Sequence, residues 1–230
     1  MLRRASLAAA LATFAVPASA GAATSVLLGH SVRGRPIVAH VIGDPSSRRR
    51  VLVVGCVHGD EPAGEAITRR LGQSPAPPGA ALWLVDSFNP DGVAADTRQN
   101  AHGVDLNRNS PWHWTRLAGI FDSGPRPLSE PESRAINRLA RRLRPAISIW
   151  YHQHASLVDD SGGDRRIERR YARLVGLPFV AFGRPPGNIT SWEDATFPHT
   201  TAFVVELPAG RLSKRSVARH AAAVLALAHG

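Results

Sequence analysis

The 230-residue sequence contains one cysteine, Cys56, and one lysine, Lys214. A single cysteine excludes an internal disulfide, so burial of apolar side chains must stabilise the fold, even in an exported protein. Cys56 lies inside an apolar run, and we interpret it as a small buried side chain. The HExxH and HxxEH motifs are also missing, which excludes the two best-known helical zinc-protease sites.

The sequence has no apolar run long enough to cross a bilayer of roughly 30 Å. The run at residues 7–16 follows Arg3 and Arg4 and precedes Ala18-Ser19-Ala20, an order typical of a secretory signal. We expect residues 1–20 to be a signal peptide and residues 21–230 to form a single domain. The expected location is secreted, periplasmic or at the cell wall. The arginine pair leaves open whether export uses the Sec or the twin-arginine route.

The formal net charge of +10 comes almost entirely from arginine. Such an excess suits an anionic setting, such as a cell wall, or an acidic substrate. The arginines are scattered and do not alternate with aromatic residues, so we do not expect nucleic-acid binding.

Apolar runs alternate with helical patterns along the chain. Strands are expected at residues 37–42, 51–57, 80–87, 146–151, 177–182 and 200–207, and helices at 61–71, 129–143, 164–175 and 213–228. Residues 93–126 are expected to form a long irregular loop, which is usually functional in a compact domain. The alternation predicts an α/β domain with a largely parallel sheet.

Polar residues stand where four of these strands end: His58, Asn89, His152 and Glu206. In such sheets, ligands gather beyond the carboxyl ends of the strands. Catalytic zinc commonly uses two histidines and one glutamate and leaves a fourth position for water. His58 and Glu61 supply two such ligands where a strand meets a helix. The third is His152 or His154, because strand alternation places both on the same face.

Further residues suit the chemistry of a zinc hydrolase. A water on zinc needs a general base that is not a ligand, and Glu206 is the candidate. Arg108 and Asn107 suit the grip of a carboxylate. Arg98 could stand near the oxyanion that forms, and Asp105 could orient a ligating histidine.

As a set, these residues resemble the zinc carboxypeptidase superfamily, and most closely its bacterial murein peptide amidase branch. The resemblance is carried by His-Gly-Asp-Glu at 58–61, Asn-Pro-Asp-Gly at 89–92, Thr97-Arg98, Val-Asp-Leu-Asn-Arg-Asn at 104–109, His152 and Val-Glu-Leu at 205–207. It implies a three-layer α/β/α sandwich around a mixed, mostly parallel sheet of about eight strands. It also implies that residues 21–230 are a single zinc-peptidase catalytic domain.

The resemblance also implies a role for each site residue. One Zn²⁺ per chain is expected on His58, Glu61 and His152, which favours His152 over His154. Glu206 would be the general base and then the proton donor, and Arg98 would stabilise the oxyanion. The remaining implied roles are substrate-carboxylate binding by Asn107 and Arg108 and bracing of His58 by Asp105.

Three features depart from the family pattern. His154 stands where the branch usually has proline. Tyr151 and Tyr171, the only tyrosines, do not match the lid tyrosine of the digestive carboxypeptidases. Ser191–Asp194 falls in the region expected to set specificity, where an acidic side chain could meet a free amino group of the substrate.

The expected function is that of an exported zinc metallopeptidase that hydrolyses an amide bond next to a free carboxylate. The implied bond joins γ-D-glutamate to diaminopimelate in murein peptides, and the expected partner is this peptide, bound by a monomer. Alternatives are a metallocarboxypeptidase on ordinary peptides and an N-acyl amino acid deacylase. A non-catalytic wall-binding protein is disfavoured, because every expected ligand, base and arginine is present.

Overall fold

The structure is a computed structural model that describes residues 24–229, and the expected signal peptide, residues 1–20, lies outside them. The strands are β1 (Thr24–His30), β2 (Pro36–Gly43), β3 (Arg49–Val54), β4 (Ala80–Val85), β5 (Ile147–Asp159), β6 (Phe179–Val180) and β7 (Thr201–Pro208). The α-helices are α1 (Glu65–Gly72), α2 (Pro90–Ala95), α3 (Pro131–Leu143), α4 (Arg165–Val175), α5 (Ile189–Thr196) and α6 (Lys214–Ala228). None of the helices in this part of the chain has the length and apolar character needed to span a membrane.

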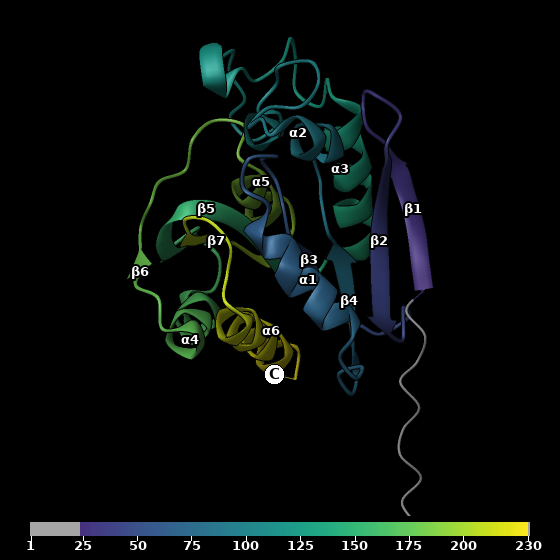
Figure 1. Ribbon diagram of the computed structural model, residues 1–230, viewed down its shortest axis with the longest axis vertical. Helices are drawn as coiled ribbons and strands as arrows, with labels where there is room; N and C mark the ends of the chain where they lie inside the picture. Colours follow the sequence, from purple (N-terminus) through teal and green to yellow (C-terminus); the bar gives the residue numbers. More distant parts are fainter. Residues whose placement is uncertain (1–23, 230) are drawn as a thin grey trace, which may run out of the picture.

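The strands described at residues 24–229 form one mixed sheet in the order β1-β2-β4-β3-β5-β6, with β7 paired to β5 (Figure 1). The pairs β1–β2 and β2–β4 are antiparallel, and the pairs of β3 with β4 and of β5 with β3 and β6 are parallel. The predicted mixed, mostly parallel sheet is therefore confirmed. It has seven strands in the described residues, where about eight were predicted.

The difference in strand number lies in β5, whose curved ribbon is visible in Figure 1. Residues 147–154 pair with β7 in ascending order, whereas Leu157 and Val158 pair with Glu206 and Val205 in descending order. Glu206 thus has His152 on one side and Leu157 on the other. Because β5 bends around β7, one continuous strand fills two positions in the sheet.

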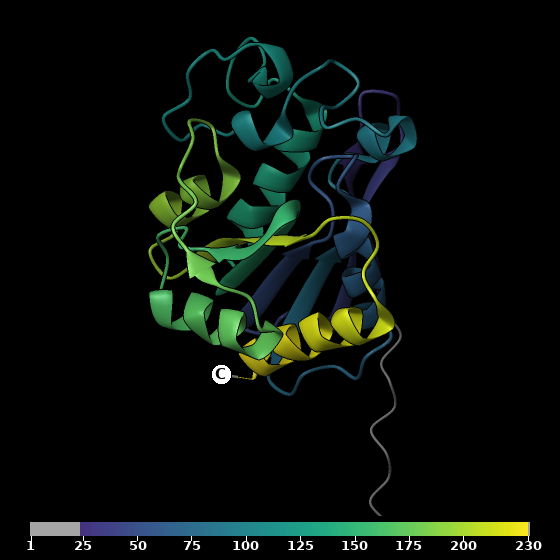
Figure 2. The ribbon, with the colours of Figure 1, turned by 60° about the vertical axis from the view of Figure 1, so that its left-hand side comes forward.

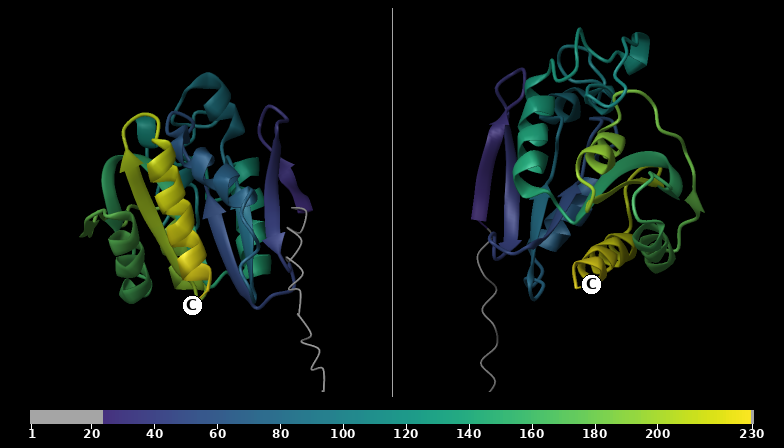
Figure 3. Two further views of the ribbon diagram at one scale, coloured as in Figure 1. Left: turned by 60° about the horizontal axis from the view of Figure 1, so that its bottom comes forward. Right: turned by 180° about the vertical axis from the view of Figure 1, so that it is seen from behind.

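Alternate residues of β3 face two separate apolar layers, as the strand period of two requires. Val51 and Val53 pack in the layer formed with α1, α4 and α6, whereas Leu52 and Val54 pack in the layer formed with α3 and α5. Figure 2 shows α4 and α6 side by side, and Figure 3 shows α6 and α3 on opposite sides of the sheet. The three-layer α/β/α sandwich is confirmed.

The strand-to-helix corner after β3 differs in detail from the expectation. β3 ends at Val54 rather than Val57, and a 3₁₀ turn, Pro62–Gly64, precedes α1. Pro62 has no N–H to donate, which is tolerated in the first turn of a helix. A β-carbon on Gly64 would fall 2.2 Å from the Gly55 carbonyl oxygen, so the corner closes tightly only with glycine.

Other elements were missed or overestimated. β1, α2 and α5 lie where no strand or helix was expected, and the strand expected at 177–182 is only the two residues of β6. The start of α5 has a clear physical cause: the Asn188 side chain accepts a hydrogen bond from Ser191 N at 2.9 Å and caps the helix.

The long loop is confirmed as mostly irregular, although it contains short 3₁₀ turns, and polar side chains order it. Asn100 Nδ2 donates to Glu130 Oε2 at 2.8 Å and to Glu132 Oε2 at 3.2 Å, and its own oxygen accepts from Val104 N. All three polar side chains are buried. This network fixes the loop to the start of α3.

Candidate active site

Three side chains converge at the carboxyl ends of β3 and β5. His58 Nδ1 lies 3.0 Å from Glu61 Oε1 and 3.1 Å from His152 Nδ1, and His152 Nδ1 lies 3.0 Å from Glu61 Oε2. Both histidines are almost fully buried. In the described residues, these three side chains, His58, Glu61 and His152, form the group that could hold a metal ion, and they are called the ligand group from here on.

The spacing of these atoms fits zinc. Ligands bonded at about 2.0–2.1 Å in a tetrahedral site stand about 3.3 Å apart, close to the distances of 3.0–3.1 Å observed here. The donor set of two imidazoles and one carboxylate is also one that catalytic zinc uses. The residues present therefore fit the ion.

Asp105 lies directly behind His58. His58 Nε2 is 3.0 Å from Asp105 Oδ1, which also accepts from Asn107 N at 2.9 Å. Arg98 donates to Asp105 Oδ2 through Nε and Nη2 and to Glu61 Oε1 through Nη1 at 3.2 Å. Because an ionised carboxylate only accepts hydrogen bonds, Asp105 holds the proton on Nε2 and leaves Nδ1 facing the other two ligands.

The electrostatics of this group are strongly coupled. Burial alone would raise the pKa of Asp105, but His58 and the charges of Arg98 and Arg108 hold it well below its usual range. Burial likewise opposes ionisation of Glu61, and His152 and His58 outweigh it, so this pKa is also lowered. Burial would lower the pKa of His58, but Asp105 and Glu61 raise it. The site is thus built to keep its carboxylates ionised.

Glu206 lies on β7, next to His152 in the sheet. It pairs with His152 in the register of β5 and β7, and its Oε2 accepts from Ala155 N at 3.4 Å. Only 8% of the residue is exposed. The structure therefore places this carboxylate beside the ligand group without making it a ligand.

Asn107 and Arg108 lie on the 3₁₀ turn Leu106–Arg108, which follows Asp105. The Asn107 amide nitrogen is 3.4 Å from His152 Nε2, and its oxygen accepts from Ile189 N at 3.2 Å. The guanidinium carbons of Arg98 and Arg108 each lie 5.3 Å from the centre of the Phe121 ring. One aromatic ring thus contacts both arginines at cation–π distance.

All these side chains except Asp105 line one cavity of about 890 Å³. Its wall also includes His154, which is exposed, whereas the buried His152 belongs to the ligand group. The structure thus distinguishes the two histidines that strand alternation left equivalent. Tyr151 and Tyr171 are fully buried, so neither is placed as a lid.

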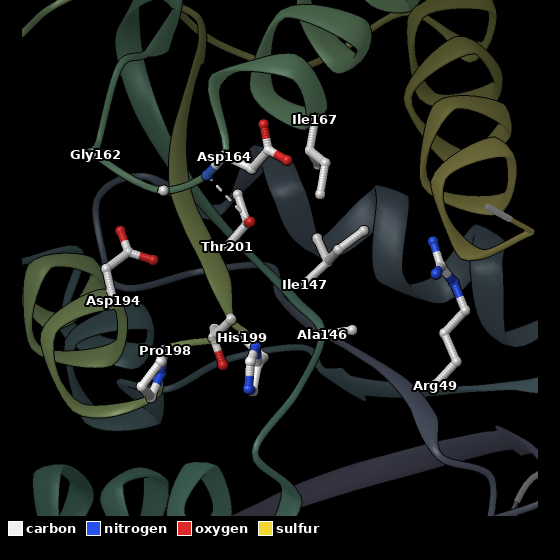
Figure 4. Close-up of a pocket in the computed structure, with 12 residues that line it drawn as sticks. Arg49, Ala146, Ile147, Gly162, Asp164, Ile167, Asp194, Pro198, His199 and Thr201 are labelled. Atoms are coloured by element: carbon white, nitrogen blue, oxygen red, sulfur yellow. Dashed lines mark hydrogen bonds between the residues drawn. The ribbon is translucent and has the colours of Figure 1, made fainter.

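The specificity region expected at Ser191–Asp194 does not line this cavity. Asp194 instead lines a second hollow of about 410 Å³, near the starts of β5 and β7 (Figure 4). Figure 4 also shows the bond from Asp164 N to Thr201 Oγ1 there, 3.2 Å long. Only the cap of α5, Asn188, reaches the large cavity.

Sequence reasoning missed several residues that line the large cavity, including Phe121, Asp159, Phe182 and Arg184. Asp159 is the acidic side chain in the wall formed after the bend of β5. No local motif signals that bend, because Ala155 and Ser156 are unremarkable in a strand. An Asp-Asp pair after an apolar strand was the one available signal.

Comparisons with known proteins agree with this geometry. The family model for zinc carboxypeptidases matches residues 80–165. The chain is 29% identical to murein peptide amidase A of Escherichia coli K12 over 180 residues, which cover 71% of this chain and 74% of the relative. It is 29% identical to murein peptide amidase A of Vibrio campbellii over 205 residues, which cover 80% and 79%.

Solved structures give the same result. The crystal structure of the murein-tripeptide amidase MpaA from Escherichia coli O157 superimposes with a TM-score of 0.74 at 25% identity, and the match covers 94% of this chain and 97% of that one. Carboxypeptidase A from Helicoverpa armigera has the same fold, with a TM-score of 0.74 at 19% identity over 90% of this chain and 68% of that one. These matches and the ligand group identify the chain as a zinc-dependent hydrolase that has the zinc carboxypeptidase fold and is similar to the murein peptide amidases.

Proposed function

We propose that this protein is an exported murein peptide amidase that cleaves the bond between γ-D-glutamate and diaminopimelate. The observation that carries the proposal is one cavity that holds the ligand group, the Glu206 carboxylate and two guanidinium groups, Arg98 and Arg108. Relatives named murein peptide amidase A match most of the chain. The net charge of +10 suits an acidic peptide of the cell wall.

Zinc on His58, Glu61 and His152 would lower the pKa of a bound water to about 7 and polarise the substrate carbonyl. Glu206 takes the proton of the attacking water and later delivers it to the leaving nitrogen. Arg98 stands beside the ligand Glu61, within reach of the oxyanion that develops on the carbonyl. Asp105 keeps the His58 ring in place.

The second arginine sets which bond is cleaved. Arg108 lines the cavity, largely buried, and with Asn107 it binds the free carboxylate of the terminal residue. Burial lowers the pKa of Arg108 from an ordinary value near 12.5, while the charge of Asp105 opposes this shift. Arginine nevertheless keeps its proton in proteins, so the guanidinium is positive at neutral pH and directs hydrolysis to the amide next to a free carboxylate.

The test compares kcat/KM for L-Ala-γ-D-Glu-meso-diaminopimelate, an ordinary C-terminal dipeptide and an N-acyl amino acid. The proposal predicts that the murein tripeptide has the highest value by at least tenfold. A higher value for the dipeptide would make the protein an ordinary carboxypeptidase, and a higher value for the N-acyl amino acid would make it a deacylase. Export is tested by the N-terminus of the mature protein, which is expected to begin at Gly21.

A further inference from the structure

The large cavity continues past the ligand group to a second polar region, formed after β5 has bent around β7. Asp159 lies there with 4% of its surface exposed, and the cavity wall includes Asp159, Val204 and Arg184. This part of the wall contains neither a residue of the ligand group nor Arg108, the arginine proposed to bind the substrate carboxylate. If Arg108 binds the terminal carboxylate, as proposed above, this part of the same cavity is available to the side chain of the terminal residue.

The Asp159 carboxylate is fixed in position. Its Oδ1 accepts from Phe182 N at 2.7 Å, and its Oδ2 accepts from Ser161 Oγ at 3.0 Å. Ser161 Oγ in turn accepts from Val204 N at 3.2 Å, which ties the group to β7. Each carboxylate oxygen has a further lone pair that can accept a hydrogen bond from a ligand.

Arg184 brings a positive charge to the same wall. Its exposed side chain makes no hydrogen bond or ion pair within residues 24–229. Burial raises the pKa of Asp159, and the positive charge of Arg184 opposes this shift and favours the ionised carboxylate. The guanidinium lies over Gly162, where a β-carbon would fall 1.5 Å from Nη2. Gly162 therefore makes the room in which this guanidinium lies.

A fixed carboxylate and an unpaired guanidinium on one wall match a ligand that carries both an ammonium and a carboxylate. We propose that Asp159 and Arg184 bind the amino-acid group at the far end of the terminal residue's side chain, with the ammonium on Asp159 and the carboxylate on Arg184. Diaminopimelate has such a group, whereas lysine has only the ammonium and norleucine has neither. The inference rests on the proposed function and names the residues that would recognise the side chain of the terminal residue of the substrate.

The test measures kcat/KM for three tripeptides, L-Ala-γ-D-Glu-X, in which X is meso-diaminopimelate, L-lysine or L-norleucine. The wild type should prefer diaminopimelate by about 10- to 100-fold over norleucine, because hydrogen bonds between charged groups are strong. Asp159→Asn should remove most of this preference, mainly through KM. Arg184→Gln should weaken cleavage of the diaminopimelate peptide and leave the lysine peptide unchanged.

The matched control is Asp160→Asn, which changes the neighbouring acid. Asp160 pairs with Arg165 at 2.7 Å and does not line the cavity, so the selectivity should stay at the wild-type value. A second readout, inhibition by free meso-diaminopimelate, should weaken in both cavity variants and not in the control. The melting temperature of each variant, compared with that of the wild type, tests whether the variant is folded.

The outcomes separate the two proposals. If the wild type cleaves all three peptides with equal kcat/KM, this inference is wrong and the proposed function stands. The same holds if Asp159→Asn lowers kcat/KM by the same factor for all three peptides. If the wild type cleaves an ordinary dipeptide and none of the three tripeptides, the proposed function is wrong and the inference falls with it.

Discussion

His58 Nε2 lies 3.0 Å from Asp105 Oδ1, in a pair that is buried on all sides. The contact leaves His58 Nδ1 directed at Glu61 and His152. Replacing Asp105 by asparagine should therefore lower zinc affinity by about 10- to 100-fold, because the ring loses its charged acceptor. Competition with a chelator of known affinity measures this. Asp122→Asn, in the Arg116 ion pair of the same loop, is the control and should bind zinc normally.

The two histidines of β5 should differ in metal binding. His152→Ala should reduce bound zinc well below one ion per chain, because only two ligands would remain. His154→Ala should keep the ion, since the exposed His154 is outside the ligand group. Zinc content after dialysis measures both. Retention of zinc by His152→Ala together with its loss from His154→Ala would reverse the assignment.

Removal of the metal should lower the melting temperature of the wild type. A ligand that binds the folded state alone stabilises by about 2.7 kcal/mol at 100 times its Kd. For a chain of this size each kcal/mol shifts the melting temperature by about 2–4 °C. Scanning calorimetry with and without chelator measures the shift, and added zinc should restore it. An unchanged melting temperature would show that the site holds no tightly bound ion.

Arg108 should affect KM only for substrates that have a free terminal carboxylate. Arg108→Gln should raise KM for a peptide with a free C-terminal carboxylate by about 10- to 100-fold, because a charge-assisted contact is lost. The C-terminal amide of the same peptide, a poor substrate of the wild type, should be affected little. Equal losses on the two peptides would mean that Arg108 supports the cavity rather than binding the carboxylate.

The buried Glu193 should make the stability of the folded protein depend on pH. Burial raises its pKa to about 8, and the nearby Ser148 and Trp150 compensate only in part. The folded state thus keeps a proton that the unfolded chain loses near pH 4.5, so this residue's contribution to stability falls as pH rises from about 4.5 to about 8. Glu193→Gln should raise the melting temperature at pH 8.5 and change it little at pH 4. An equal gain at both values would show that folding does not raise the pKa of Glu193.

The sequence was most informative where the chemistry is local. His58 and Glu61 are three residues apart at one corner, and a single strand-to-helix transition brings them together. The choice between His152 and His154 depends on which side chain is buried among the other ligands, which strand periodicity does not predict. Asp159 was missed because the sequence does not predict the bend of β5, after which the strand continues on the other side of β7. The acids of α5 were misplaced because that segment was interpreted as a loop, although Asn188 is a good helix cap.

The most direct test of the proposed chemistry is the mass of the products formed from L-Ala-γ-D-Glu-meso-diaminopimelate by the zinc-loaded enzyme. The wild type should release free diaminopimelate and L-Ala-D-Glu. Glu206→Gln, with its zinc content and melting temperature unchanged, should form the same products about 100- to 10,000-fold more slowly. Cleavage at the L-Ala–D-Glu bond, or full activity of Glu206→Gln, would contradict the assignment.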